Sequence, residues 1–140
     1  MTTDPSLSFQ TALRAALIAD PAVTALLPAA HVRAGSTRPD KLPTIILANP
    51  QTIHLGRASG GFYVTSVAVD LHIWALDDGA DMARQIGVAA ALALWDAPHA
   101  EGIAVDDYMR PGFSYMRDPD PELAYCHGIG TAEAVVRWRV

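Results

Sequence analysis

The sequence is poor in cysteine, in lysine and in charge overall. Cys126 is the only cysteine of 140 residues, so no internal disulfide can form, and cysteine usage leaves the redox compartment open. Charged residues make up 18%, fewer than the roughly 25% of an average domain. This shortage hints that part of the surface is hidden against a partner. The formal charge is −5 and no basic tract is present, which argues against a dedicated nucleic-acid groove.

Long hydrophobic runs are also missing. The apolar run Ile86–Trp95 is too short to span a bilayer, and Met1–Ser8 is polar and acidic, unlike a signal peptide. We therefore expect a product made in the cytoplasm with no membrane role. Apolar residues are abundant, at 51%, which argues against a disordered chain. The length predicts a single domain, residues 1–140, that is large enough to bury a real core.

Hydrophobic periodicity and punctuation by proline and glycine predict seven elements. Asp4-Pro5 and Asp20-Pro21 are helix-start signals, because each places an N-cap acceptor before a proline. In chain order, the expected elements are helices at 6–19 and 21–27, strands at 44–48 and 62–76, a helix at 79–95, an extended segment from 103 that continues towards 117, and a strand at 125–140. Residues 31–42 and 49–61 are expected to be loops.

Two strands and one helix have clear buried faces. Strict alternation puts Val67, Val69, Leu71 and Ile73 on one face of the strand at 62–76, opposite Ser66, Ala68, Asp70 and His72. The last strand has an apolar face of Ala132, Ala134, Val136, Trp138 and Val140, and the helix has an inward stripe of Met82, Ile86, Ala89, Ala90, Ala93 and Leu94. The fold class is therefore α+β, in the order α-α-β-β-α-β-β. We expect a small, mostly antiparallel sheet of about four strands with helices packed on one face.

Candidate catalytic pairs have structural explanations that we favour. Asp70 and His72 share a strand face and could form a base and its orienting group, but a polar sheet surface is the preferred interpretation. Cys126 and His127 are adjacent on a strand and so point to opposite faces. We expect Gly128 and Gly130 to mark a bulge or bend at the start of the last strand.

Metal and cofactor sites have no support in the sequence. The five histidines show no zinc-binding spacing, and the glycine pairs lack the context of a phosphate-binding loop. The acidic residues Asp118, Asp120 and Glu122 could bind a cation, but two intervening prolines favour a solvated turn. We predict no enzymatic activity, no catalytic residue, no metal and no cofactor.

Taken together, the elements resemble the tail terminator, or tail completion, proteins of long-tailed phages and of phage-derived gene transfer agents. The similarity rests on the order and spacing of four pieces that span most of the chain. They are the segment Ala19–Leu27 after a short N-terminal helix, the strand segment Leu42–Leu47, the long strand Val67–Trp74 followed by a helix to Trp95, and Arg117–Asp120 leading into the closing strand.

The resemblance implies a structural protein of the virion. Such proteins form a six-subunit ring that caps the tail tube, stops its polymerisation and joins the tail to the head connector, while DNA passes through the lumen. The implied partners are other copies of the chain, the major tail tube protein and a head–tail connector or stopper protein. A head–tail adaptor or stopper is the alternative within the same particle. A small enzyme that uses Asp70 and His72, or a small-molecule binding module, are the alternatives outside it.

Assembly contacts are expected in the irregular segment Asn49–Gly61 and near it. Loops of this length are usually functional or mobile, and we predict that this one is mobile in the free subunit and orders on docking. The candidate contact residues are His54, Leu55, Arg57 and Phe62. Trp74 is a further candidate, because it follows the polar face of its strand and tryptophan is favoured at interfaces.

Overall fold

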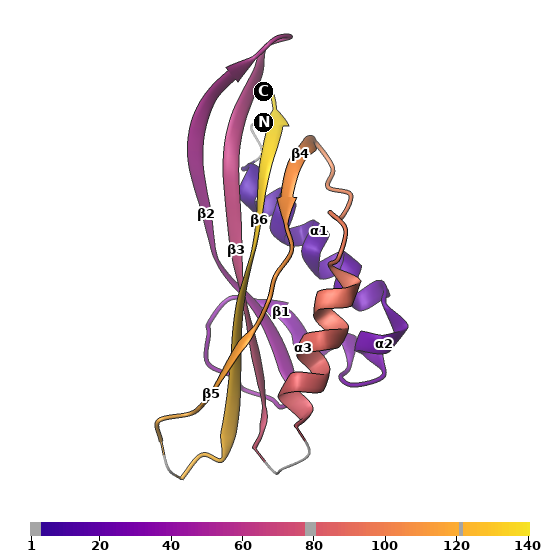
Figure 1. Ribbon diagram of the computed structural model, residues 1–140, viewed down its shortest axis with the longest axis vertical. Coiled ribbons are helices and arrows are strands. Elements are labelled where there is room, and N and C mark those ends of the chain that lie inside the picture. The colour runs from indigo at the N-terminus through magenta and orange to yellow at the C-terminus, as the bar shows by residue number, and fades with distance from the viewer. Residues whose placement is uncertain (1–3, 78–80, 121) are drawn as a thin grey trace.

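The computed structural model describes residues 4–77, 81–120 and 122–140. In this part of the chain, three α-helices lie on one face of a mixed six-stranded sheet, and the molecule is elongated along the strands (Figure 1). The helices are α1 (Pro5–Ala19), α2 (Pro21–Thr24) and α3 (Met82–Ala93), with a short 3₁₀ turn, η1, at Ala29–His31. None of these helices has the length and hydropathy that crossing a bilayer requires.

The sheet is built around two long central strands. In space the order is β1-β2-β3-β6-β4, and β5 pairs with β6 beyond the end of β4. All neighbouring strands are antiparallel except β1 and β2. The bounds are β1 (Val32–Ala34), β2 (Thr44–Ala58), β3 (Phe62–Leu76), β4 (Ile103–Met109), β5 (Ser114–Arg117) and β6 (Tyr125–Trp138).

One main core lies between the sheet and the helices. The predicted inward face of β3 is confirmed, since Val67, Val69, Leu71 and Ile73 are all fully buried. They pack with Phe9, Leu13 and Leu17 of α1, with Ile86, Ala89 and Ala90 of α3, and with Ala132, Ala134 and Val136 of β6. The alanines leave room for α3 to approach the sheet closely. Burial of this apolar surface is the main term that stabilises the fold.

Both predicted helix-start signals are confirmed. The Asp4 carboxylate accepts a 2.8 Å hydrogen bond from the backbone N–H of Ser6, and Asp20 does the same for Ala22. The second helix is shorter than predicted, because it ends at Thr24 rather than at Leu27. Leu27 is nonetheless buried in the core. The third helix is also shorter than the predicted 79–95, and its predicted start at Gly79 lies outside the described residues, as do Met1–Thr3 of the N-terminal segment.

The predicted count of four strands is wrong. Val32–Ala34, within the expected loop at 31–42, forms β1 and pairs in parallel with Ile45–Leu47. The extended segment from 103 to 117 forms two strands, β4 and β5, separated by residues 110–113, and both pair with β6. A three-residue strand and a strand interrupted by Pro111-Gly112 are too short to show the alternation on which the prediction relied.

The expected loop at 49–61 is also wrong in its secondary structure. Residues 49–58 continue β2 and pair with β3 up to the turn at Ser59–Gly61. Asn49 adopts a positive φ of 51°, and the register shifts between Ala48 and Gln51. The Asn49-Pro50 pair therefore marks a bulge within a strand rather than its end. The sequence looked irregular because almost every residue from 49 to 58 is exposed to solvent.

Gly128 and Gly130 mark close packing and not the predicted bulge. The register of β6 against β3 is unbroken across both residues. A Cβ atom on Gly128 would lie 2.9 Å from Cε1 of Tyr115, and a Cβ on Gly130 would meet the carbonyl oxygen of Gly112. The missing side chains thus make room for Tyr115 of β5 and for the segment that links β4 to β5.

Candidate assembly surface

The distal part of the β2–β3 hairpin forms an arm that extends beyond the helices (Figure 1). We define the arm as residues 51–68, in which Gln51–Ala58 of β2 pair with Phe62–Ala68 of β3. Residues 51–57 are all exposed, although they belong to a paired strand. Because β1 pairs only with residues 45–47, the outer edge of β2 has no neighbouring strand along the arm within the described residues. An unpaired edge presents backbone donors and acceptors to any chain that approaches it.

The hydroxyl of Thr65 on β3 links the arm to β6 through a hydrogen bond. The hydroxyl of Thr65 is fully buried and accepts a 2.8 Å hydrogen bond from Nε1 of Trp138. The same hydroxyl oxygen lies 3.0 Å from Nδ1 of His54 on β2. The ring centroids of Tyr63 and Trp138 are 5.2 Å apart. Trp138, expected in the core, is half-buried and packs against it. The arm is therefore held to the body by side chains as well as by its ladder.

Arginines and aromatic rings gather at the tip of the arm. The guanidinium carbons of Arg139 and Arg137 lie 4.9 and 5.6 Å from the ring centroid of Phe62. Arg57 lies 5.1 Å from the centroid of Tyr63. Arginine and aromatic side chains are the types enriched at protein interfaces, because they bury large areas and offer several donors.

The arm also differs from the rest of the chain in charge. Residues 41–69 contain no aspartate or glutamate, although the chain has 15 acidic residues. The arm itself carries Arg57 and His54, and the C-terminal end of β6 adds Arg137 and Arg139. In the described structure, Arg137 is paired with Asp106 at 2.7 Å. The arm thus carries one arginine and no acidic residue, on a protein with a net charge of −5.

Four of the five sequence-predicted contact residues lie on the arm. His54, Leu55 and Arg57 are exposed, and Phe62 is half-buried at the tip. Trp74 is different: it lies at the base of the hairpin and is only 2% exposed. Its Nε1 donates a 2.7 Å hydrogen bond to the carbonyl of Thr37, in the β1–β2 loop that covers it. Its burial removes Trp74 from the candidate contacts, and the alternation that placed it on a polar face could not reveal the covering loop.

A histidine pair lies next to Trp74. Nδ1 of His72 is 2.8 Å from Nε2 of His127, and the His127 ring stacks on Trp74 with centroids 3.8 Å apart. Burial lowers the pKa of His72, and burial together with the neighbouring His72 lowers the pKa of His127 to about 4. Both rings are therefore neutral at neutral pH and serve as packing groups.

The structural interpretation of the two candidate catalytic pairs fits the observed contacts. The Asp70 carboxylate accepts hydrogen bonds from Thr131 Oγ1 at 2.9 Å and from Asn49 Nδ2 at 3.2 Å, whereas Nδ1 of His72 faces His127. Cys126 packs against the main core, whereas the adjacent His127 lies against Trp74 on the opposite face of the sheet. Burial raises the pKa of the Cys126 thiol, which makes the nucleophilic thiolate scarcer.

The carboxylates of Asp118 and Asp120 accept hydrogen bonds from other groups of the protein. Asp118 is buried and accepts from Nη1 of Arg38 at 2.8 Å and from the N–H of Asp120 at 2.9 Å. The Asp120 carboxylate accepts from the N–H of Glu122. These carboxylates stabilise the turn. In the part of the chain that is described, no three metal-ligating side chains come together.

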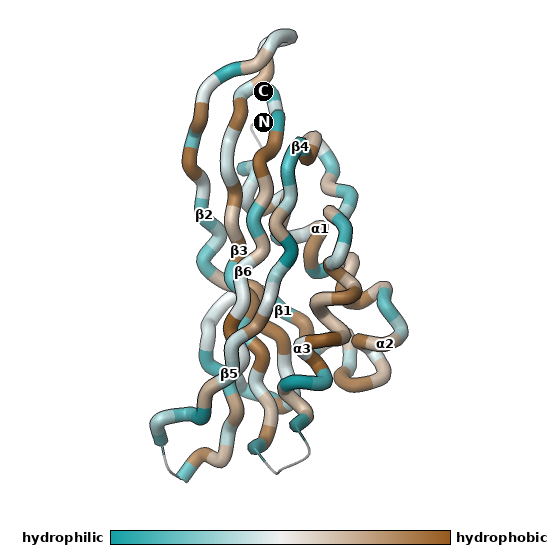
Figure 2. Tube along the Cα trace, viewed as in Figure 1, coloured by the Kyte–Doolittle hydropathy of each residue, from teal (hydrophilic) through white to brown (hydrophobic). Residues whose placement is uncertain are grey.

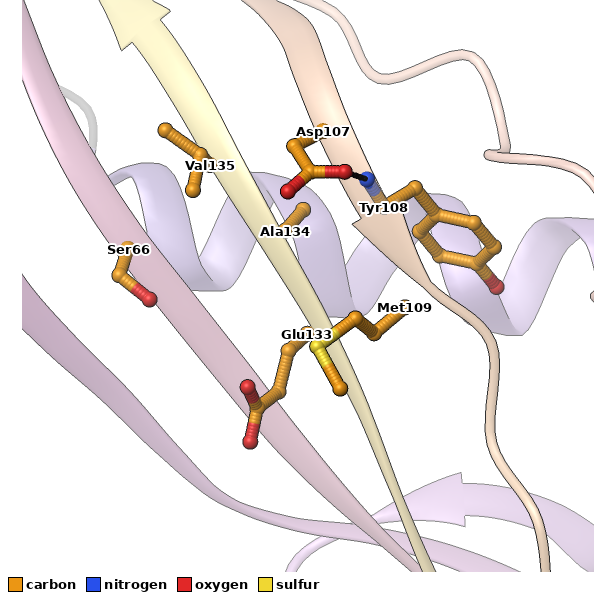
Figure 3. A pocket seen from close by; sticks show the side chains of 7 residues that line it. All are labelled: Ser66, Asp107, Tyr108, Met109, Glu133, Ala134 and Val135. Atoms are coloured by element: carbon orange, nitrogen blue, oxygen red, sulfur yellow. Dashed lines mark hydrogen bonds between the residues drawn. The ribbon is translucent and has the colours of Figure 1, made fainter.

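A small depression lies on the helix-free face of the sheet. It measures about 30 Å³ and lies between β3, β6 and β4, lined by Ser66, Asp107, Tyr108, Met109, Glu133, Ala134 and Val135 (Figure 3). A space of this size holds only a few water molecules. In Figure 3 the Asp107 carboxylate bonds to the Tyr108 backbone nitrogen, and the Glu133 carboxylate lies apart from it. A face of this shape suits contact with another protein better than binding of a small molecule.

Sequence reasoning missed one further surface, the outer side of α3. Val88, Leu92 and Trp95 are 60%, 62% and 49% exposed, and they recur at spacings of four and three residues. Val88 and Leu92 lie on one face of α3, and Trp95 follows two residues after the helix ends at Ala93; we call these three residues the α3 stripe. The prediction used the same periodicity only to find the inward face. A second apolar periodicity on the same helix was the available signal.

The exposed arm and the α3 stripe are typical of a structural protein that works through its surfaces. The sequence pattern of the tail completion protein gp17 family matches residues 11–137, and the chain belongs to that family. It is therefore a non-enzymatic component of a virion.

A solved structure of the virion of a native gene transfer agent particle contains a chain of similar fold. The TM-score is 0.65 with 17% identical residues, and the alignment covers 91% of this chain and 93% of that one. No curated protein sequence matches the chain. At this identity, the similarity to the particle shows a shared fold.

Proposed function

We propose that the chain is a tail terminator, a single-domain subunit that forms a six-membered ring, caps the tail tube and stops its polymerisation. The observation that carries the proposal is the combination of tail completion family membership with an exposed arm that has no acidic residue, on an otherwise acidic subunit. Four arm residues, His54, Leu55, Arg57 and Phe62, are the proposed assembly contacts. The arm is proposed to be more mobile in the free subunit and to become ordered on docking.

The shape of the subunit supports a closed ring. Its two long sides differ, with the free edge of β2 on one and α3 on the other (Figure 1). Different surfaces on opposite sides allow head-to-tail contacts, which generate a ring when the rotation closes. The two ends of the ring would then face the tail tube protein and the head–tail connector or stopper.

DNA would pass through the lumen of this ring without sequence-specific binding. Attraction to DNA phosphates grows with the number of lysine and arginine contacts. The net charge of −5 on each subunit limits such attraction. A lumen of this kind would let the duplex slide during packaging or delivery.

A stopper in the same connector region is the second candidate. The observation that favours it is the strand content, because the described chain has six strands where the sequence predicted four. The matching family, which is a tail completion family, favours the terminator. The two roles differ in what happens to tails when the protein is missing.

Deletion of the gene in a particle-producing strain tests the proposal. We expect electron micrographs to show tails longer than normal that are not joined to heads, because nothing stops tube growth. Wild-type protein supplied in trans should restore the normal length, whereas the double variant Leu55→Asp with Arg57→Glu should not. The exposed Lys41→Glu, a charge reversal outside the arm, is the matched control and should restore it. Normal-length tails without heads would instead identify a stopper.

A further inference from the structure

The α3 stripe is an exposed apolar surface of the subunit. It lies on the side of α3 away from the sheet, while Ile86, Ala89 and Ala90 fill the sheet side. Trp95 is partly covered by Arg110, whose guanidinium carbon is 4.2 Å from the ring centroid and whose Nε donates to the Trp95 carbonyl at 2.8 Å. Scattered apolar residues on a surface are ordinary, but two on one helix face with an exposed tryptophan just beyond the helix end form a patch of the kind that marks an interaction surface.

The arm carries the matching apolar residues. Ile53 and Leu55 are 64% and 57% exposed, and their strand has a free outer edge. Figure 2 shows hydrophobic segments along the upper part of β2 and along α3, and the two elements lie on opposite sides of the molecule. A residue on the arm and a residue on the stripe therefore cannot meet within one subunit.

The charges around the two surfaces are complementary. The arm carries Arg57 and His54, and residues 41–69 contain no acidic residue. The segment that follows the stripe, residues 95–107, contains no lysine or arginine and carries Asp96, Glu101 and Asp107, together with Asp106, which is already paired with Arg137 of the same subunit. Opposite charges across an interface steer association and fix its register.

We infer that the α3 stripe is the docking site for the arm of a second copy of this chain. Ile53 and Leu55 of one subunit pack on Val88, Leu92 and Trp95 of the next, and Arg57 faces the acidic segment beyond Trp95. The contact is head-to-tail, since the two surfaces differ and lie on opposite sides. The inference rests on the proposed ring function and deepens it by assigning the two faces of the subunit contact.

Cysteine cross-linking tests the contact. In a Cys126→Ala background, the double variant Leu55→Cys with Leu92→Cys is assembled on tail tubes and oxidised. We expect a ladder of covalent oligomers on non-reducing gels. The control pair Leu55→Cys with Leu76→Cys should give no ladder, because Leu76 is 51% exposed but lies at the opposite end of β3. A mixture of the two single variants, Leu55→Cys and Leu92→Cys, should give only covalent dimers.

The outcomes separate this inference from the proposed function. Rings that form without the 55–92 cross-link overturn the inference and leave the ring function intact. If no rings form on tubes with the wild-type protein, both fail. A ladder from the control pair that equals the 55–92 ladder also overturns the inference, because it shows random contact.

Charge reversal gives a second and independent test. We expect Arg57→Glu to weaken ring formation about tenfold or more, and Asp96→Arg in the same chain to restore most of it. Recovery of assembly in the double variant identifies a pair across the interface. Equal and additive losses from the two single variants, with no recovery, contradict the assignment of these two surfaces.

Discussion

The two halves of the β2–β3 hairpin share one antiparallel ladder but lie in opposite environments. At the base, residues 44–48 of β2 are all buried, with helices on one side and Trp74 with the β1–β2 loop on the other. In the arm, residues 51–57 are all exposed. The Asn49-Pro50 bulge separates the two halves.

This difference assigns separate tasks to the two halves. The base buries apolar side chains and so contributes to folding, whereas exposed Ile53 and Leu55 contribute little to the stability of the isolated subunit. Apolar groups that stay in water in the monomer can be buried only by a partner. Under the proposed function, the same pair of strands serves stability at one end and assembly at the other.

The largest expected effect comes from equal truncations in the two halves. Ile73→Ala at the base should lower the free energy of unfolding by about 2–5 kcal/mol, because it leaves a cavity in the core. Ile53→Ala in the arm should change it by less than about 0.5 kcal/mol. Denaturant unfolding of both variants measures the contrast. Similar losses in the two variants would mean that the arm is part of the folding core.

The next largest loss of stability is expected at Gly128, which lies beside the buried end of the hairpin. Gly128→Ala should cost about 1–3 kcal/mol, because the new Cβ overpacks against the Tyr115 ring. Gly112→Ala is the matched control, since a Cβ there meets no atom within 4 Å. Thermal unfolding should separate the two variants clearly. Equal melting temperatures would show that Gly128 is not required for this packing.

The connection between the arm and the body predicts a smaller loss. Thr65→Val keeps the shape but removes the acceptor for Nε1 of Trp138, so we expect a cost on the order of 1–2 kcal/mol. Hydrogen exchange should speed up in the arm and remain unchanged in residues 69–73. Faster exchange throughout the sheet would contradict a local role for Thr65.

The smallest expected effect is a loss of stability at low pH, caused by two histidines at the buried end of the hairpin. The folded-state pKa values of His72 and His127 lie below the ordinary 6.5, so the folded protein binds fewer protons than the unfolded chain. The stability that these neutral rings provide is therefore present above pH 6.5 and is lost as pH falls towards about 4. Asp70 opposes the shift at His72, while Arg38 lowers and Asp118 raises the pKa of His127.

The variant His127→Gln should flatten this acid-dependent loss relative to the wild type. His99→Gln, at an exposed position, should leave the pH profile unchanged. Denaturant unfolding at several pH values between 7.5 and 4 measures the difference between each variant and the wild type. A His127→Gln profile that parallels the wild type would remove this histidine from the account.

Elements with long apolar periodicity were predictable from sequence. The faces of β3 and β6, both aspartate helix caps and the inward side of α3 follow from spacing alone. The arm was not predictable as a strand, because an exposed strand that includes Asn49-Pro50 and Gly56 shows neither alternation nor apolar bias. The burial of Trp74 depends on Thr37 and Arg38 from a distant loop, which local patterns do not encode.

The candidate surface was predicted only in part. Four candidate contact residues were chosen because the segment around His54 looked irregular, although that segment turned out to be paired. The receiving stripe on α3 was missed, because one helix can carry two apolar faces and only the inward one was sought.

Hydrogen exchange of the arm, compared between free subunits and rings assembled on tubes, tests the central claim most directly. The account predicts that the amides of residues 51–58 that point away from β3 exchange fast in the free subunit. In the ring they should slow by about tenfold or more, while those of residues 69–73 stay unchanged. Exchange in the arm that is equally slow in both states, or equally fast in both, would contradict the claim that the arm is the assembly surface.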